Sequence, residues 1–213
     1  MENILIAGAN GITGKQIVNL LKASQYFNPI AMVRKEAQLN QFKADGVETV
    51  LADLTKDLTH AVKGADKVLF AAGSGGKNVV EVDQEGAKRL MAVSKMAKVK
   101  KFVMLSTMGA DNPQAVEGME DYMKAKQNAD EYLRSSDLNY TIIRPGTLNN
   151  SQGKGKIELS EKLNKQGKIS RADVAQTLVR ALHDDAPNNS TFEIIQGNTL
   201  IGEAMNELNM SVN

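Results

Sequence analysis

The sequence has no cysteine and no tryptophan, and only two histidines, four prolines and 4% aromatic residues among its 213 residues. Without cysteine the chain cannot form disulfides, thiolate metal sites, iron–sulfur clusters or a cysteine nucleophile. His60 and His183 are far apart in the sequence, so we expect no histidine-based metal site and no bound metal. A chain of this length can build a core without cross-links, and we therefore expect a cytoplasmic protein.

Charge of one sign and long apolar runs are also missing. The 26 Lys and Arg nearly balance the 25 Asp and Glu, so the composition gives no support for nucleic-acid binding. No apolar run approaches the roughly 18 residues of a membrane-spanning helix, and Met1-Glu2-Asn3 is unlike a signal peptide. We expect a small-molecule substrate as partner, with no nucleic acid and no membrane, and a monomer or a homodimer.

Short apolar segments alternate with segments of helical period. The expected strands are residues 3–7, 29–33, 47–51, 67–72, 101–106, 139–144 and 191–195, and the expected helices are residues 11–22, 82–98, 119–134 and 171–183. Several strands are apolar on both faces, which is typical of parallel strands between two helical layers. The pattern predicts an α/β fold with a doubly wound (Rossmann), mostly parallel sheet of about seven strands and helices on both faces.

The polar segment Leu148–Gly167 interrupts this alternation, and we expect a loop or a small insertion there. We therefore predict one domain over residues 1–213, with residues 147–170 and 185–213 as small substrate-side segments packed on it. Ser170 is the expected N-cap of the helix that follows.

Glycines cluster directly after the first expected strand. The segment reads Gly8-Ala9-Asn10-Gly11-Ile12-Thr13-Gly14 and opens a helix. The first glycine allows a tight turn, the second allows backbone to approach a pyrophosphate, and the third allows close helix–strand packing. The helix N-terminus offers free N–H groups to the phosphates. A ligand-free turn could carry the same glycines, but the strand–turn–helix context favours a dinucleotide held by residues 8 and 10–14.

The end of the second expected strand bears on the choice of cofactor. Arg34 and Lys35 stand there, and no carboxylate precedes Glu36. An NAD site usually has an acidic residue at this point for the ribose hydroxyls, whereas a guanidinium can grip a 2′-phosphate in a bidentate way. Arg34 could also be an ordinary solvated residue, but we predict NADP (NADPH) as the cofactor.

A tyrosine and a lysine share one face of the helix expected at residues 119–134. Tyr122 and Lys126 are four residues apart, so both side chains can reach one ligand. The spacing alone can arise by chance, since a surface helix with a half-buried tyrosine would look the same.

The order of these motifs resembles the short-chain dehydrogenase/reductase superfamily, in particular the small bacterial NAD(P)H-binding proteins of its atypical and extended, epimerase/dehydratase-like branches. The resemblance covers nearly the whole chain. It implies that Tyr122 transfers the proton at a substrate carbonyl, while Lys126 binds the nicotinamide ribose and helps the tyrosine ionise. It also implies a hydroxyl at the end of the fifth strand, for which we favour Thr107 over Ser106. Asp83 stands where extended relatives often have asparagine, so the usual role of that asparagine is in doubt.

The resemblance also assigns the remaining cofactor contacts. It places an acidic residue near the adenine, a small-residue segment along the adenosine ribose and diphosphate, and a Pro-Gly turn at the nicotinamide. In this sequence the matching positions are Asp53 and Leu54, then Ala71, Ala72, Gly73 and Ser74, and finally Pro145, Gly146 and Leu148.

These features predict an NADPH-dependent oxidoreductase that reduces a small carbonyl, quinone-like or flavin-like acceptor through the Tyr-x-x-x-Lys site. Two alternatives stay open. One is a non-catalytic NADP(H)-binding redox sensor, and the other is an isomerase or dehydratase that holds its cofactor tightly. The motifs stop where the substrate pocket would begin, so the sequence does not identify the acceptor.

Overall fold

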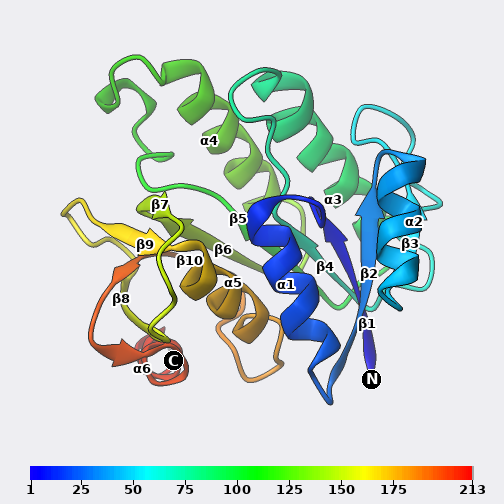
Figure 1. Ribbon diagram of the computed structural model, residues 1–213. Coiled ribbons are helices and arrows are strands. Elements are labelled where there is room, and N and C mark those ends of the chain that lie inside the picture. The colour runs from blue at the N-terminus through cyan, green and yellow to red at the C-terminus, as the bar shows by residue number, and fades with distance from the viewer. Residues whose placement is uncertain (213) are drawn as a thin grey trace.

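The computed structural model describes residues 1–212, in which strands and helices alternate from the first residues onward (Figure 1). The first half contains β1 (Glu2–Ala7), α1 (Ile12–Lys22), β2 (Phe27–Val33), α2 (Glu36–Ala44), β3 (Glu48–Leu51), β4 (Lys67–Phe70), the π-helical segment η1 (Val79–Gly86) and α3 (Ala87–Met96). The second half contains β5 (Lys101–Leu105), the short 3₁₀ segment η2 (Pro113–Ala115), α4 (Glu120–Arg134), β6 (Tyr140–Pro145), β7 (Thr147–Asn149), β8 (Lys156–Ser160), β9 (Lys168–Ser170), α5 (Arg171–Arg180), β10 (Ser190–Gln196), β11 (Thr199–Leu200) and α6 (Ile201–Val212).

The main sheet confirms the predicted fold class. Within residues 1–212 it has nine strands in the order β11-β8-β10-β6-β5-β4-β1-β2-β3. The strands from β3 to β10 pair in parallel, and all seven expected strands are among them. The order reverses direction between β1 and β4, and ligands of such sheets bind outside the carboxyl ends of the strands at this switch point.

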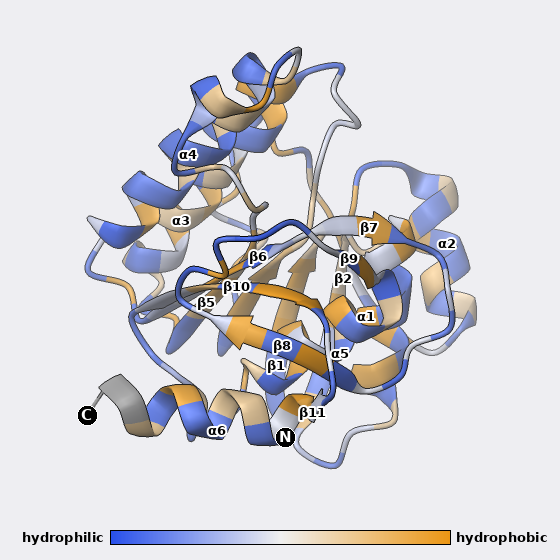
Figure 2. Ribbon diagram, turned by 90° about the vertical axis from the view of Figure 1, so that its left-hand side faces the viewer, coloured by the Kyte–Doolittle hydropathy of each residue, from blue (hydrophilic) through white to orange (hydrophobic). Residues whose placement is uncertain are grey.

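Two apolar layers cover the sheet because successive residues of a strand point to opposite faces. Ile4 and Ile6 of β1 pack with α1, α5 and α6, whereas Leu5 and Ala7 pack with α3 and α4. In Figure 1, α1 and α5 lie side by side in front of the sheet, and Figure 2 shows the apolar residues concentrated on the central strands. Strands buried on both faces explain the continuous apolar runs in the sequence. Among the described residues, no helix combines the length and apolarity required to cross a membrane.

The segment Leu148–Gly167, expected as a loop or a small insertion, contains the strand β8, which pairs antiparallel with β10. Its Ile157 is completely buried, and β11 pairs with its outer side. Leu159, two residues further on, also packs against the core, but two apolar residues in a polar stretch are too weak a signal to predict a strand. Of the predicted substrate-side segment 185–213, residue 213 lies outside the described part of the chain.

Ser170 is the N-cap of α5, as predicted. Its hydroxyl accepts a hydrogen bond from the Asp173 N–H at 3.0 Å. Asp173 is fully buried, and its carboxylate accepts from the N–H groups of Lys154 and Gly155 at 2.9 and 2.7 Å. The start of α5 therefore holds the turn that leads into β8 in place.

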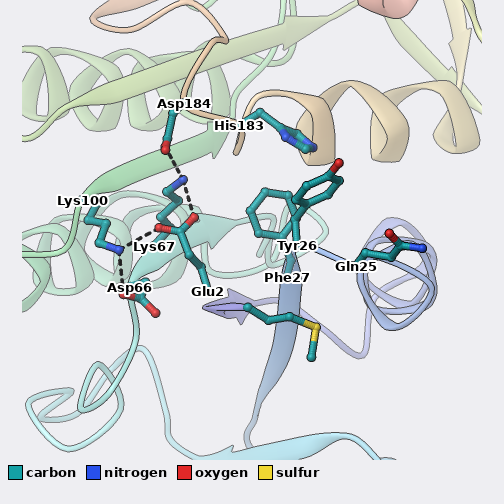
Figure 3. Close-up of a pocket in the computed structure, with 10 residues that line it drawn as sticks. Glu2, Gln25, Tyr26, Phe27, Asp66, Lys67, Lys100, His183 and Asp184 are labelled. Atoms are coloured by element: carbon teal, nitrogen blue, oxygen red, sulfur yellow. Dashed lines mark hydrogen bonds and ion pairs between the residues drawn. The ribbon is translucent and has the colours of Figure 1, made fainter.

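The opposite, amino-terminal edge of the sheet contains a cavity of about 410 Å³ (Figure 3). Lys67 is buried there between the carboxylates of Glu2 and Asp184, each 2.6 Å from its ammonium group. Phe27 and His183 meet edge to face with ring centroids 4.8 Å apart. These contacts pack the amino-terminal ends of the strands together. The predicted cofactor residues lie at the opposite, carboxyl-terminal ends of the same strands.

Lys101, also on this edge, is buried without such carboxylates. Its ammonium donates to the carbonyl oxygens of Ala186 and Pro187 at 3.5 and 3.3 Å. Burial, together with the charge of Lys67, lowers the pKa of Lys101 to about 8. Below that pH the folded protein carries the unfavourable buried charge.

We therefore expect Lys101→Met to stabilise the protein at pH 7, by up to about 3 kcal/mol, and to lose this advantage as the pH rises from about 8 to 10.4. In this range the unfolded lysine still binds a proton that the folded lysine has released, so the stability of the parent rises with pH. Urea unfolding of both proteins at a series of pH values measures the difference. Lys63→Met, an exposed lysine, is the control, and a pH-independent difference would contradict the prediction.

Candidate active site

The predicted site residues come together at the carboxyl-terminal edge of the parallel strands. They follow β1, β2, β3, β4, β5 and β6, and Tyr122 and Lys126 lie on α4, which follows β5. Parallel strands end on the same edge, so residues distant in the sequence become neighbours. The positions placed there are Gly8, Asn10, Gly11, Ile12, Thr13, Gly14, Arg34, Lys35, Asp53, Leu54, Ala71, Ala72, Gly73, Ser74, Ser106, Thr107, Pro145 and Gly146.

The turn from β1 to α1 has the geometry of a phosphate site. Gly8 has a φ of +89°, and a Cβ there would lie 2.6 Å from the backbone nitrogen of Ala72. A Cβ on Gly14 would collide with the carbonyl oxygen of Gly8, so this glycine is needed for helix–strand packing. Gly11 is the N-cap of α1 and provides no side chain to cap it. The first N–H groups of α1 are therefore available to an anion.

The surface beside this turn is partly apolar. Ile12 is 58% exposed at the first position of α1, whereas Thr13 is buried beneath it. An exposed isoleucine next to uncapped N–H groups offers a bound dinucleotide both apolar contact and hydrogen-bond donors.

The ends of β2 and β3 bring Arg34 close to Asp53. Both Arg34 and Lys35 have exposed side chains, and their backbone N–H groups donate to the Gln38 Oε1 atom at 3.2 and 3.1 Å. Hydrogen bonds from Thr55 lower the pKa of Asp53, and the positive charge of Arg34 lowers it further. Arg34 and Asp53 therefore form a pair of opposite charges at the outer end of the predicted cofactor site.

The segment that follows β4 is hydrogen-bonded to the side chain of Asp83. The Ser74 N–H donates to the Asp83 Oδ2 atom at 2.9 Å, and the Ser74 hydroxyl is buried without a hydrogen-bond partner among the described residues. Leu54 packs against Gly86, where an added Cβ would lie 2.8 Å from the leucine Cβ. The backbone of residues 71–74 thus crosses the carboxyl edge between the glycine turn and η1.

Tyr122 and Lys126 lie on the inner side of α4. Lys126 is only 6% exposed, and its ammonium lies 5.7 Å from the centre of the Tyr122 ring. The same ammonium lies 3.5 Å from the Asp83 Oδ1 atom. The tyrosine is half-buried, so its hydroxyl group can still meet a ligand that enters from solvent.

The two candidate hydroxyls after β5 have different surroundings. Ser106 is 4% exposed, and its side chain lies beside the buried carboxylate of Asp130. Thr107 is half-buried, and its Oγ1 atom makes one long contact of 3.4 Å to the Met108 carbonyl oxygen. The threonine is thus the more accessible of the pair.

The turn after β6 has a structural reason for its glycine. The Gly146 N–H donates to the Ile194 carbonyl oxygen at 2.9 Å, and an added Cβ would collide with the carbonyl oxygen of Gly167. Leu148 lies in β7, paired with Ile169 of β9, and packs partly buried against the core. The structure therefore explains Gly146 and Leu148 by packing, whether or not a nicotinamide ring lies above them.

A buried ion pair beside Lys126 was missed by the sequence analysis. Arg144 donates to the Asp130 carboxylate through Nε at 2.9 Å, with Nη2 also 2.8 Å away, and the acid is completely buried. Burial raises the pKa of Asp130, although the nearby charges of Arg144 and Lys126 oppose the rise. Two signals could have revealed the pair. Asp130 follows Lys126 by four residues, and Arg144 interrupts an apolar strand.

Further ionic contacts connect this ion pair with the loop between β8 and β9. Arg144 lies 3.8 Å from Asp111, whose carboxylate binds Lys162 at 2.5 Å. Lys162 also lies 3.3 Å from the buried carboxylate of Glu193. Charged residues therefore link α4, the β5–α4 loop and the β8–β9 loop across the candidate substrate side.

Comparison with known proteins agrees with this arrangement. The family model for NAD(P)H-binding proteins matches residues 8–185. The chain is 38% identical to "Uncharacterized sugar epimerase YhfK" of Bacillus subtilis (strain 168), over 96% of this chain and 99% of that protein. It is 28% identical to sanguinarine reductase of Eschscholzia californica, with 94% and 91% of the two chains covered.

Two solved structures have the same fold, and each is more similar in sequence to this chain than sanguinarine reductase is. One is a Bacillus halodurans protein described as an NAD-dependent epimerase/dehydratase, with a TM-score of 0.92 and 32% identity over 97% of this chain and all of that one. The other is the oxidoreductase ylbE of Lactococcus lactis, with a TM-score of 0.88 and 31% identity over 97% and 96% of the two chains. The chain therefore belongs to the NAD(P)H-binding family and has a Rossmann fold, and its relatives include oxidoreductases.

Proposed function

We propose that the protein is an NADPH-dependent reductase of a small carbonyl, quinone-like or flavin-like acceptor. One observation carries the proposal. Tyr122 and the buried Lys126 lie together on α4, on the same sheet edge as the uncapped glycine turn of α1. A proton donor and a dinucleotide site on one edge are what a hydride transfer to a carbonyl requires.

Each side chain has a distinct role in the proposal. NADPH, when bound, supplies the hydride that adds to the acceptor. The Tyr122 hydroxyl donates its proton to the acceptor oxygen as negative charge develops there. Thr107, the more accessible of the two hydroxyls after β5, donates a hydrogen bond to the same oxygen, with Ser106 as the alternative. Lys126 holds the nicotinamide ribose beside Tyr122, since its ammonium lies 5.7 Å from the centre of the tyrosine ring.

The dinucleotide would lie across the edge of the sheet. Its diphosphate would rest on residues 8 and 10–14, and its adenosine half would extend toward Asp53, Leu54 and Arg34. The segment from Ala71 to Ser74 would run along the ribose and diphosphate, and Pro145, Gly146 and Leu148 would border the nicotinamide. The name of sanguinarine reductase, a relative whose alignment covers 94% of this chain and 91% of that protein, adds support for reduction as the reaction type.

The direct test is NADPH oxidation by the purified protein against a panel of small carbonyls, quinones and flavins. We expect turnover with at least one class and none without an acceptor. NADPH binding without oxidation by any member of the panel would count against the reductase and leave a binding role.

Replacing Arg34 tests the preference for NADPH. A charge-assisted bidentate contact contributes about 1.5–3 kcal/mol, so Arg34→Ala is expected to weaken NADPH binding about 10- to 100-fold and to leave NADH binding nearly unchanged. Equilibrium titration with both nucleotides measures this, and Lys56→Ala is the control for loss of a nearby charge. Tighter NADH than NADPH binding in the parent, with no effect of Arg34→Ala on NADPH, would overturn the preference.

A second candidate follows from the names of two relatives, which are a sugar epimerase and an epimerase/dehydratase. An enzyme of that kind returns the hydride to its own intermediate, so it can keep one cofactor molecule through many turnovers. Denaturing the freshly purified protein would then release bound dinucleotide in near-equal amount. Purification of the protein free of nucleotide would favour the reductase.

A further inference from the structure

Asp83 is a buried carboxylate that touches both halves of the candidate site. It is 1% exposed. Its Oδ2 atom accepts the hydrogen bond from Ser74 N–H at 2.9 Å, and its Oδ1 atom lies 3.5 Å from the Lys126 ammonium. One side chain therefore connects the segment after β4 with the lysine of α4.

The backbone of η1 places the Asp83 side chain toward α4 and the candidate site. Asp83 lies in η1, a π-helical segment that packs against α4, and π-helical turns occur frequently at functional sites. The other two acids of η1, both within the described residues, bind elsewhere. Glu81 pairs with Arg89 at 2.9 Å, and Glu85 pairs with Lys88 at 3.1 Å. Asp83 is thus the acid of η1 that faces the site.

The charges around Lys126 leave Asp83 as its counter-ion. Four groups face the ammonium or its immediate neighbours. The Tyr122 ring and Asp130 come from α4 itself, Asp83 comes from η1, and Arg144 comes from β6. Arg144 already binds the Asp130 carboxylate with two nitrogens, which neutralises that acid. Of the two acids that the described part of the chain places near Lys126, Asp83 is therefore the one not already paired with Arg144.

We infer that Asp83 is a positioning residue that ties the segment Ala71–Ser74 to Lys126 and supplies the counter-charge beside this lysine, where the dinucleotide would bind. The inference rests on the proposed function, because it assumes that Lys126 meets the nicotinamide ribose. A buried ammonium without a counter-charge is driven toward its neutral form, which binds a ribose hydroxyl less strongly. Ser74 is fixed by the second oxygen of the same carboxylate, so movement of the segment and the place of the lysine are coupled.

The variant Asp83→Asn separates charge from shape. The amide oxygen can still accept from Ser74 N–H, whereas the negative charge beside Lys126 is lost. We expect the pH above which NADPH affinity falls to move down by at least one unit relative to the parent. Fluorescence titration of NADPH at a series of pH values, without any acceptor, measures this shift. Asp83→Glu, which restores the charge, is expected to move the profile back toward that of the parent.

Glu85→Gln is the matched control, since it removes a carboxylate from the same segment that binds Lys88 instead. Its pH profile is expected to coincide with that of the parent. A profile of Asp83→Asn that also coincides with the parent would overturn the inference, because a merely structural role predicts loss of stability without a shift.

Hydrogen exchange tests the Ser74 contact without relying on NADPH. In the parent, the Ser74 amide is expected to exchange at least about tenfold more slowly than those of Gly75 and Gly76, which follow it in the same segment. Equal exchange at all three would refute the contact even if Asp83→Asn failed to fold. A protein that binds no NADPH would sink the proposed function, while slow exchange at Ser74 would still support the link to Asp83.

Discussion

Tyr122→Phe is expected to lower kcat/KM for NADPH-dependent reduction by about 10²- to 10⁴-fold, the usual contribution of a positioned general acid. The substitution removes one hydroxyl group and keeps the ring that lies 5.7 Å from the Lys126 ammonium. The packing of α4 and the charge of Lys126 are thus preserved. NADPH affinity is therefore expected to stay nearly the same, which assigns the loss to the proton-transfer step.

Steady-state kinetics with the best acceptor of the panel, together with NADPH titration, measures both quantities. Tyr132→Phe is the matched control. This tyrosine also lies on α4, but it is 38% exposed and its ring faces Lys88 at 5.9 Å. Undiminished activity of Tyr122→Phe would remove Tyr122 from the mechanism and leave another proton donor to be found.

Arg144→Met is expected to destabilise the protein by about 3–5 kcal/mol, because it leaves a completely buried carboxylate without its partner. Asp130 would then be protonated or would draw water into the base of the site. For a chain of this length the loss corresponds to a fall in Tm of about 10 °C. Urea unfolding followed by circular dichroism measures the free energy directly.

The double variant Asp130→Leu/Arg144→Met tests the reason for that loss. Removing both charges removes the unpaired acid, so most of the stability is expected to return. Arg134→Met, an exposed arginine at the end of α4, controls for the general effect of losing a positive charge. A single variant Arg144→Met within about 1 kcal/mol of the parent would show that water or another group can replace the arginine.

The inner parallel strands were predictable because they are buried on both faces and read as apolar runs, such as Val68-Leu69-Phe70, whereas β3 lies at the edge of the sheet and has no buried residue. Helices α1, α4 and α5 were predictable from their apolar stripes. The helix expected at residues 82–98 consists of the π-helical segment η1 and the α-helix α3. No side-chain pattern in the sequence predicts this change of helix type. Helix α2 was not predicted, because Phe42 is its only buried residue within Glu36–Ala44.

The candidate site was predictable where one short segment contains the whole signal. The glycine turn is local, and so is the four-residue spacing of Tyr122 and Lys126. The contacts between segments were not predictable. Asp83 with Lys126, Asp130 with Arg144, and Arg34 with Asp53 each join residues from different elements. Sequence spacing carries no information on which of the many charged residues meet across a sheet edge.

The sequence by itself determined the class of fold, the place of the glycine turn and the spacing of Tyr122 and Lys126, because backbone propensity, burial period and helix spacing act over a few residues. Only the tertiary structure decided which buried charges pair, that β8 and β11 extend the sheet, and that Gly146 is required by contact with Gly167. These outcomes depend on desolvation and close packing between segments that are far apart in the chain. The physical reason is that the burial of a side chain is defined only once the helices have packed on the two faces of the sheet.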